Sequence, residues 1–187
     1  MTTATQEDTG RLRFPETFPR DPSFGLLPRS GWQKRIWEEL KPLLSRHGWS
    51  VRRAGAVYFY DFMIQICLDN WTLHFQVSRD GKEFANEAYG DLEGKALIAF
   101  DVEGGRGVKP SDLKQLQKEI SAALRSSGVY EKLEVDEADL RQNHLVMDGE
   151  RKAIDKDDVG FIAERLVEYM DAIYDVAHPV LERLQSQ

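Results

Sequence analysis

The feature that most constrains the fold is a change of hydrophobic period in the middle of the chain. Residues 56–68 read AVYFYDFMIQICL, and after Asp69-Asn70 the chain continues as WTLHFQVS. Aromatic and β-branched residues dominate both runs, and the second alternates between apolar and polar residues, which is typical of strands. Side chains two apart on a strand share a face. One face of the second strand is therefore expected to carry Trp71, Leu73, Phe75 and Val77, and the other Thr72, His74, Gln76 and Ser78.

Segments with helical spacing and further strand-like runs surround this pair. A helix is predicted from Ser30, which with Gln33 forms a capping box, to a stop at Gly48, with Pro42 as a point where it bends or ends early. KALIAFDVE at 95–103 is a third strand, followed by a helix that Ser111 caps. VYEKLEV at 129–135 and HLVMDGERKAI at 144–154 read as strands, the second bent by an Asp148-Gly149 turn. A long helix is predicted to start near residue 155. These elements predict an α+β fold: a mainly antiparallel sheet flanked by helices, with a long C-terminal helix.

Length and composition fit one domain over residues 30–187, preceded by a flexible tail and a Pro/Phe-rich extended arm at 1–29. The single cysteine, Cys67, excludes an internal disulfide and lies in an apolar run, as a buried structural cysteine does. The start has no secretory signal pattern, and no apolar run is long enough to span a bilayer. We therefore expect a cytoplasmic protein with no membrane contact.

The net charge of −7 is unevenly distributed. Residues 11–53 carry ten basic and four acidic side chains, whereas the remainder is strongly acidic. The sequence pI near 5.2 argues against a general nucleic-acid-binding module. A basic N-terminal part on an acidic body could contact nucleic acid. Because the basic segment has no dense Lys/Arg cluster, we expect instead that the basic and acidic faces are solvated or attract each other within the fold.

The C-terminal segment carries a heptad-like apolar seam. Its positions are Val159, Ala163, Leu166, Met170, Ile173, Ala177, Val180 and Leu184, with Pro179 expected to bend or interrupt the helix. Such a seam pairs two copies of a chain into a homodimer or packs a helix on its own sheet.

The candidate chemistry lies at the end of the third strand. Asp101 and Glu103 are two residues apart and are expected on one face, where two carboxylates could hold Mg²⁺ or Mn²⁺. Asp69 or Asp91, each in a turn, could supply a third carboxylate, and Lys109 could contact a phosphate. This is the candidate metal and catalytic set.

Neighbouring residues have structural as well as chemical interpretations. The loop GGRGVKP lacks the spacing of a phosphate-binding P-loop and reads as a turn into the next helix. His74 lies on the polar face of its strand and could approach the carboxylates if that face is a cleft. Glu38 or Glu39 on the first helix could orient a water molecule. Cys67 has no adjacent base, so covalent catalysis is not expected.

The order helix, three strands, helix, strand over about residues 30–135 resembles the core of the PD-(D/E)XK nuclease-like superfamily. That resemblance implies an acidic residue near the second strand and an acid-x-lysine motif on the third, which bind metal and activate water. In this sequence DVE places Glu103 where the family usually has lysine, and no proline-aspartate pair precedes the strand. Some restriction enzymes of the family carry glutamate at that position.

Two functions follow from these observations. The first is a small non-catalytic interaction protein: a regulator, inhibitor, immunity-type factor or accessory subunit that binds another protein and needs no cofactor. The aromatic-proline arm, the seam helix and the acidic body favour it. The alternative is a Mg²⁺- or Mn²⁺-dependent nuclease that acts on DNA or RNA through Asp101 and Glu103.

Overall fold

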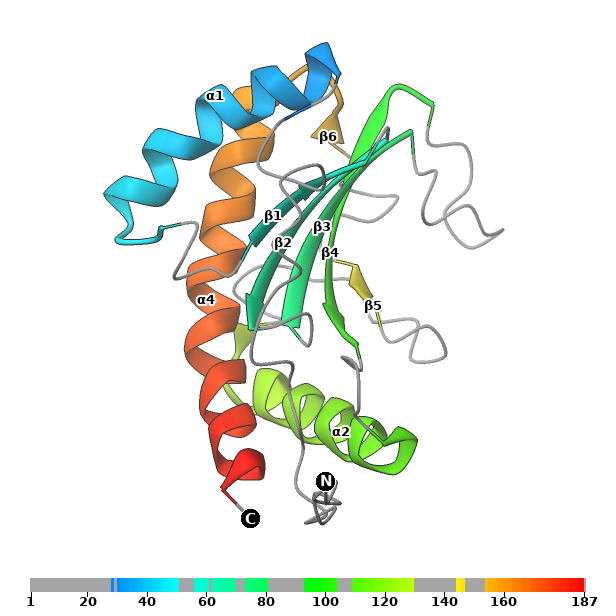
Figure 1. The fold of residues 1–187 in the computed structure, drawn as a ribbon, viewed down its shortest axis with the longest axis vertical. Coiled ribbons are helices and arrows are strands. Elements are labelled where there is room, and N and C mark those ends of the chain that lie inside the picture. The colour runs from blue at the N-terminus through cyan, green and yellow to red at the C-terminus, as the bar shows by residue number, and fades with distance from the viewer. Residues whose placement is uncertain are drawn as a thin grey trace, which may run out of the picture.

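The structure is a computed structural model in which helices pack on a twisted antiparallel sheet (Figure 1). It describes residues 28, 30–50, 56–60, 62–69, 73–80, 93–103, 109–129, 144–146 and 154–186. The helices are α1 (Gly31–Arg46), α2 (Pro110–Ser126) and α4 (Val159–Gln185). The strands are β1 (Ala56–Phe59), β2 (Met63–Asp69), β3 (Leu73–Arg79), β4 (Lys95–Val102), β5 (His144–Val146) and β6 (Ile154–Asp155).

All described strand pairings are antiparallel, and the strand order is β1-β2-β3-β4-β5. The short strand β6 also pairs with β4, at residues 95–96, while β5 pairs with residues 99–101. Both therefore lie along the edge of β4 that β3 leaves open. This sheet, with its helices and the long α4, confirms the predicted α+β class.

The first strand-like run is divided in the structure, which corrects the prediction of one continuous strand over residues 56–68. Tyr60 N donates to Met63 O (2.8 Å) and Met63 N to Tyr60 O (3.4 Å), which closes a tight hairpin between β1 and β2. The apolar composition concealed this reversal, because buried strands on both sides of the turn give the same residue types.

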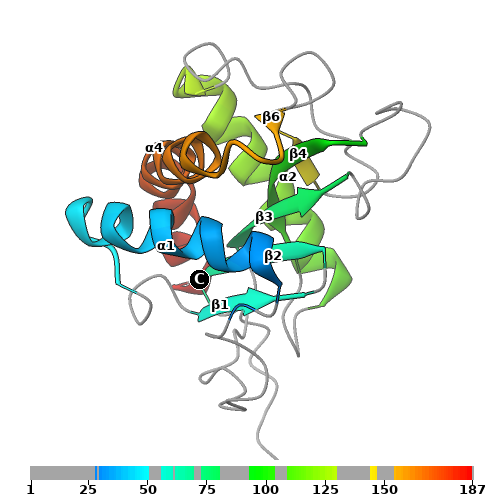
Figure 2. The ribbon, with the colours of Figure 1, turned by 90° about the horizontal axis from the view of Figure 1, so that it is seen from above.

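Helices α1 and α4 cover one face of the sheet, as the view along the sheet shows (Figure 2). Strand residues of alternate parity contribute to this core, including Ile64, Ile66, Phe75, Ile98 and Phe100. Leu73, Phe75 and Val77 share this face, as the alternation predicted. Helix α2 packs against α4 across the foot of the sheet, where Gln117 Nε2 donates to Val102 O (2.9 Å).

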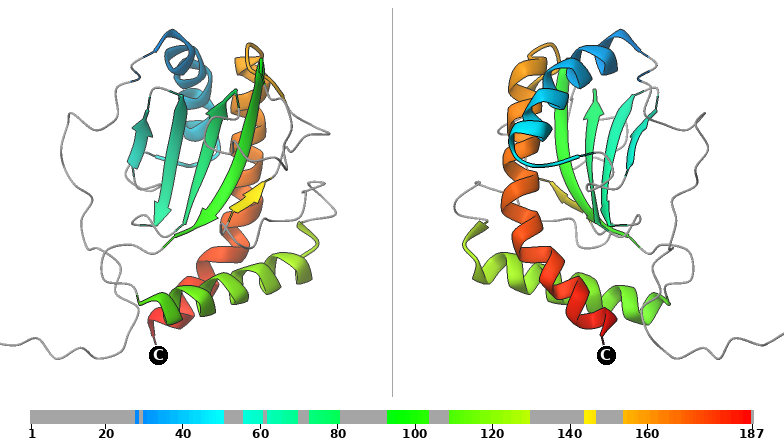
Figure 3. Two further views of the ribbon diagram at one scale, coloured as in Figure 1. Left: turned by 90° about the vertical axis from the view of Figure 1, so that its right-hand side faces the viewer. Right: turned by 60° about the vertical axis from the view of Figure 1, so that its left-hand side comes forward.

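No described helix lies over the opposite face of the sheet (left panel of Figure 3), yet its side chains are buried. This face combines apolar and polar groups, namely Tyr58, Met63, Gln65, Cys67, His74, Gln76, Ser78, Leu97, Ala99 and Asp101. A buried polar strip is costly unless its groups find partners. The buried polar side chains that could form a functional site are therefore on this face.

Helix α1 begins as predicted. Ser30 Oγ accepts from Gln33 N, and Gln33 Oε1 accepts from Ser30 N, both at 3.1 Å, which completes the capping box. The helix continues through Pro42 to Arg46, and Gly48 then adopts a left-handed φ of 77°. Pro42 therefore lies inside the helix and does not end it early.

The starts of the other helices differ from the predictions. Ser111 does not cap α2: the helix begins at Pro110, Lys109 is the N-cap without a side-chain hydrogen bond, and Ser111 lies in the first turn. Proline is favoured at that first position because its fixed φ suits the helix and no N–H is required there. Helix α4 starts at Val159, where Asp158 Oδ1 accepts from Phe161 N (3.2 Å).

The seam of α4 faces the interior of its own chain. From Ala163 onward, each predicted seam residue is buried in the core shared with α1 and α2. The helix continues through Pro179 to Gln185 without interruption. Packing within the chain therefore accounts for the seam.

Several predictions fall outside the described residues. These are the arm at 1–29 apart from residue 28, the turn that contains Asp91, the strand at 129–135 beyond Val129, and the Asp148-Gly149 bend. The strand HLVMDGERKAI appears as β5 and β6 at its two ends.

Candidate metal centre

Strand register brings four residues of metal-ligating types into one row across the sheet. Cys67 of β2 lies opposite His74 of β3, His74 opposite Asp101 of β4, and Asp101 opposite His144 of β5. Directly opposed residues of antiparallel strands share a face. Residues up to 77 positions apart in the sequence thus belong to one row across the sheet.

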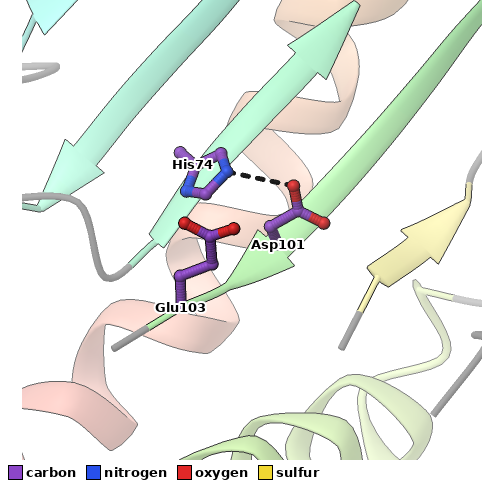
Figure 4. A group of neighbouring side chains, drawn as sticks. All are labelled: His74, Asp101 and Glu103. Carbon is purple, nitrogen blue, oxygen red and sulfur yellow. Dashed lines mark ion pairs between the residues drawn. The ribbon is translucent and has the colours of Figure 1, made fainter. Parts of the chain in front are cut away.

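His74, Asp101 and Glu103 form a compact cluster on this face (Figure 4). Each offers a ligand atom, and these atoms all lie within 4.8 Å of one another. His74 Nε2 is 3.0 Å from Asp101 Oδ2, and both side chains are 0% exposed. Glu103, just beyond the end of β4, is exposed, so the cluster has a closed side and an open side.

The ring of His74 has its described partners on one side. The amide nitrogen of Gln76 and Asp101 Oδ2 both lie 3.0 Å from His74 Nε2, and Gln76 is itself buried. By contrast, His74 Nδ1 has no hydrogen-bond partner among the described residues, and neither have Gln76 Oε1 and Gln65 Oε1. Gln76 Oε1 and Gln65 Oε1 are acceptors, and His74 Nδ1 is one when the ring proton is on Nε2, so a bound ion, ligand or water molecule would satisfy them.

Cys67 is not part of a nucleophilic arrangement. Burial raises the pKa of its thiol well above the ordinary value, and the negative charge of Glu103 raises it further. A catalytic cysteine needs the opposite change, because the thiolate is the nucleophile. Although Cys67 and His74 are neighbours, they lack the electrostatics of a cysteine–histidine pair.

The other residues of the predicted site lie on separate elements or outside the described residues. Asp69 ends β2 and its side chain lies outside the described residues, as does all of Asp91. Lys109 is exposed at the N-cap of α2. Glu38 and Glu39 are exposed on α1, which packs on the opposite face of the sheet from His74. Of the predicted set, the structure brings Asp101 and Glu103 together.

The candidate metal and catalytic set predicted from the sequence included neither His74 nor Gln76. Alternation put both on the polar face of β3, but only the register of β3 against β4 shows that His74 opposes Asp101. Identifying the pair from the sequence would have required knowing how the connection between residues 80 and 95 sets the register of β3 against β4.

One imidazole and two carboxylates form a suitable donor set for a divalent cation. Nitrogen and oxygen ligands lie about 2.0–2.2 Å from such an ion, so neighbouring ligands are about 3 Å apart. The His74–Asp101 separation fits either two neighbouring ligands or a ligand and the group that orients it.

Comparison with family models, with curated proteins and with solved structures finds no match to this chain. The nuclease resemblance therefore stays a prediction. Within the described part of the chain, no helix combines the length and the apolar character needed to cross a membrane.

Proposed function

We propose that the protein is a divalent-metal-dependent hydrolase that cleaves phosphodiester bonds in DNA or RNA, with Mg²⁺ or Mn²⁺ at the cluster of His74, Asp101 and Glu103. The convergence of these side chains carries the proposal. Two carboxylates compensate the charge of the ion, and a bound metal lowers the pKa of a coordinated water toward neutrality, which supplies a nucleophile.

The shape of the cluster favours catalysis over a purely structural metal. Structural sites surround the ion with protein ligands, whereas catalytic sites combine about three protein ligands with an open position. His74 and Asp101 are buried and Glu103 is exposed, so water and substrate can approach from the side of Glu103. The phosphodiester substrate rests on the nuclease resemblance drawn from the sequence, whose pattern has three strands between the two helices, whereas the structure has four.

A groove between α1 and α4 favours a second function, that of a non-catalytic interaction protein such as a regulator, inhibitor, immunity-type factor or accessory subunit. The groove has a volume of about 460 Å³. Four acidic side chains from α4 line it, namely Glu164, Glu168, Asp171 and Asp175. Asp171 accepts from Trp49 Nε1 and contacts His47 Nδ1, both at 2.6 Å, which fixes one wall. A basic segment of a partner protein would complement this surface.

The deciding experiment combines calorimetric titration with Mn²⁺ and cleavage of end-labelled single- and double-stranded DNA and RNA. We expect metal uptake by the wild-type protein and metal-dependent cleavage. Glu103→Gln removes one ligand charge and should lower the cleavage rate by about 100-fold or more, since even groups that only orient a ligand are worth about 10–100-fold.

Glu39→Gln is the matched control, because it removes an equally exposed carboxylate from α1 on the other face of the sheet. It should leave both readouts unchanged. A protein that takes up no metal and cleaves none of the substrates contradicts the proposal. Metal uptake without cleavage favours the interaction protein.

A further inference from the structure

We infer that His74 binds the metal through Nδ1, that Gln76 and Asp101 are positioning residues at Nε2, and that the ion is a transition metal of the Zn²⁺ type in preference to Mg²⁺. This inference rests on the proposed metal site and assigns roles within it.

The division of roles follows from the surroundings of the imidazole ring. Both described partners of the ring, Gln76 and Asp101, lie 3.0 Å from Nε2. Nδ1 is the ring nitrogen without a partner, on a side chain that is fully buried. Figure 4 shows the carboxylate of Glu103 beside the same ring, and one ligand atom from each of His74, Asp101 and Glu103 lies within 4.8 Å of the others, which leaves room for an ion between them. Nδ1 and Glu103 are therefore the ligands, and Nε2 is the anchored end.

Metal binding through Nδ1 requires that Nε2 of His74 carry the ring proton. A neutral imidazole that gives its Nδ1 lone pair to a metal carries its proton on Nε2, and that proton needs an acceptor. Asp101 Oδ2 lies 3.0 Å from Nε2, close enough to accept that proton once the ring and the carboxylate align. The carboxamide of Gln76 must then present its oxygen rather than its nitrogen to Nε2, by a half-turn of its last torsion. Binding of the metal thus selects one orientation of Gln76.

The ligand set also selects the ion. Imidazole nitrogen suits Zn²⁺ and similar transition metals, whereas Mg²⁺ prefers oxygen ligands and keeps much of its water. A site that commits its buried histidine to the metal, and uses Asp101 to orient that histidine, has a single directly ligating carboxylate in Glu103. With this ligand set, the binding of Mg²⁺ would not compensate for the loss of its hydration shell.

The test is long-range ¹H–¹⁵N correlation spectroscopy on the wild-type protein with ¹⁵N-labelled histidine. One sample is titrated with Zn²⁺ and a separate sample with Mg²⁺. We expect the His74 Nδ1 resonance to move to the position of a coordinated nitrogen, with Nε2 protonated. Mg²⁺ should leave both resonances in place at concentrations at which Zn²⁺ saturates the site. Zn²⁺ on Nε2, or an equal response to Mg²⁺, overturns the inference and leaves metal-dependent hydrolysis standing. No response to any metal overturns both.

Variants of Gln76 test its positioning role. Gln76→Leu removes one of the two side chains that hold Nε2 and should weaken Zn²⁺ binding about 10–100-fold. Gln76→Glu supplies a carboxylate oxygen there and should restore the affinity. Ser78→Ala is the control, because Ser78 is a buried polar residue on the same face of β3, four residues from His74. Equal losses in Gln76→Leu and Ser78→Ala, without rescue by glutamate, would assign Gln76 a structural role only.

Discussion

At the scale of single residues, Cys67 illustrates how position on the sheet determines reactivity. Its side chain is fully buried in β2, opposite His74. Burial and the charge of Glu103 both raise the pKa of the thiol, so the protonated form dominates at neutral pH. A thiol in this state is shielded and a poor nucleophile.

We therefore expect Cys67 to react with iodoacetamide only when the protein opens. At pH 8 the native protein should be alkylated about 100-fold more slowly than the protein in 6 M guanidinium, since both access and the thiolate fraction are reduced. Mass spectrometry of timed samples measures the two rates. Comparable rates in the native and unfolded states would show that the thiol is accessible in the native protein, which would contradict the burial of Cys67.

At the scale of elements, Asp80 joins the ends of three strands. Its Oδ1 accepts from Gly94 N (2.9 Å), which precedes β4, and from Lys156 Nζ (2.8 Å), which follows β6. Asp80 has a φ of 57°, a left-handed conformation that aspartate and asparagine tolerate better than most residues. Burial raises the pKa of Asp80, but the contacts with Lys156, Gly94 N–H and Arg79 outweigh it, and the pKa is lowered.

Asp80→Asn keeps the shape and the backbone preference but removes the charge, so we expect a loss of about 1–2 kcal/mol in the free energy of unfolding at pH 7. A lowered folded pKa contributes stability above the unfolded value of about 3.9, and this contribution disappears as the pH falls through the folded pKa. The difference between wild type and variant should therefore shrink below about pH 4.

Urea unfolding from pH 3 to 7 measures this difference. Asp157→Asn is the control, since its ion pair with Arg35 is more than half exposed at both ends and contributes little to stability. A difference between wild type and Asp80→Asn that stays constant down to pH 3 would contradict the electrostatic explanation.

At the scale of the whole molecule, α4 is the element on which the others pack. It contacts α1 and α2, and its C-terminal half leans toward α2 (right panel of Figure 3). Its apolar seam is buried, whereas Phe161 is the exposed large hydrophobic residue of the described chain, at 45%. The seam thus holds the domain together, and a dimer through α4 would have to use the outer face.

Two substitutions in α4 separate these roles. Leu166→Ala leaves a cavity in the core and should lower the free energy of unfolding by about 2–5 kcal/mol. Phe161→Ser should change it by less than about 0.5 kcal/mol, because surface substitutions rarely cost more. Chemical unfolding measures both. Sedimentation analysis of the wild-type protein and Phe161→Ser measures the oligomeric state of each. A wild-type dimer that dissociates in this variant would show that the outer face of α4 pairs two copies.

How much the sequence could predict differs between elements and site. The capping box at Ser30 and the alternation of Leu73, Phe75 and Val77 are local signals, and both are present in the structure. The hairpin at Tyr60–Met63 was not predicted, because buried strands on each side of it continue one apolar pattern. The cap at Ser111 was wrong, because Pro110 competes for the start of the same helix.

The sequence by itself determined the periodicities, and with them the α+β class and the faces on which Asp101, Glu103 and His74 lie. Those are local properties, set by backbone geometry within a few residues. Only the tertiary structure decided that His74 opposes Asp101, that the polar face is buried, and that the seam of α4 is used within the chain. Strand register and helix packing depend on contacts between distant segments, which no short stretch of sequence encodes.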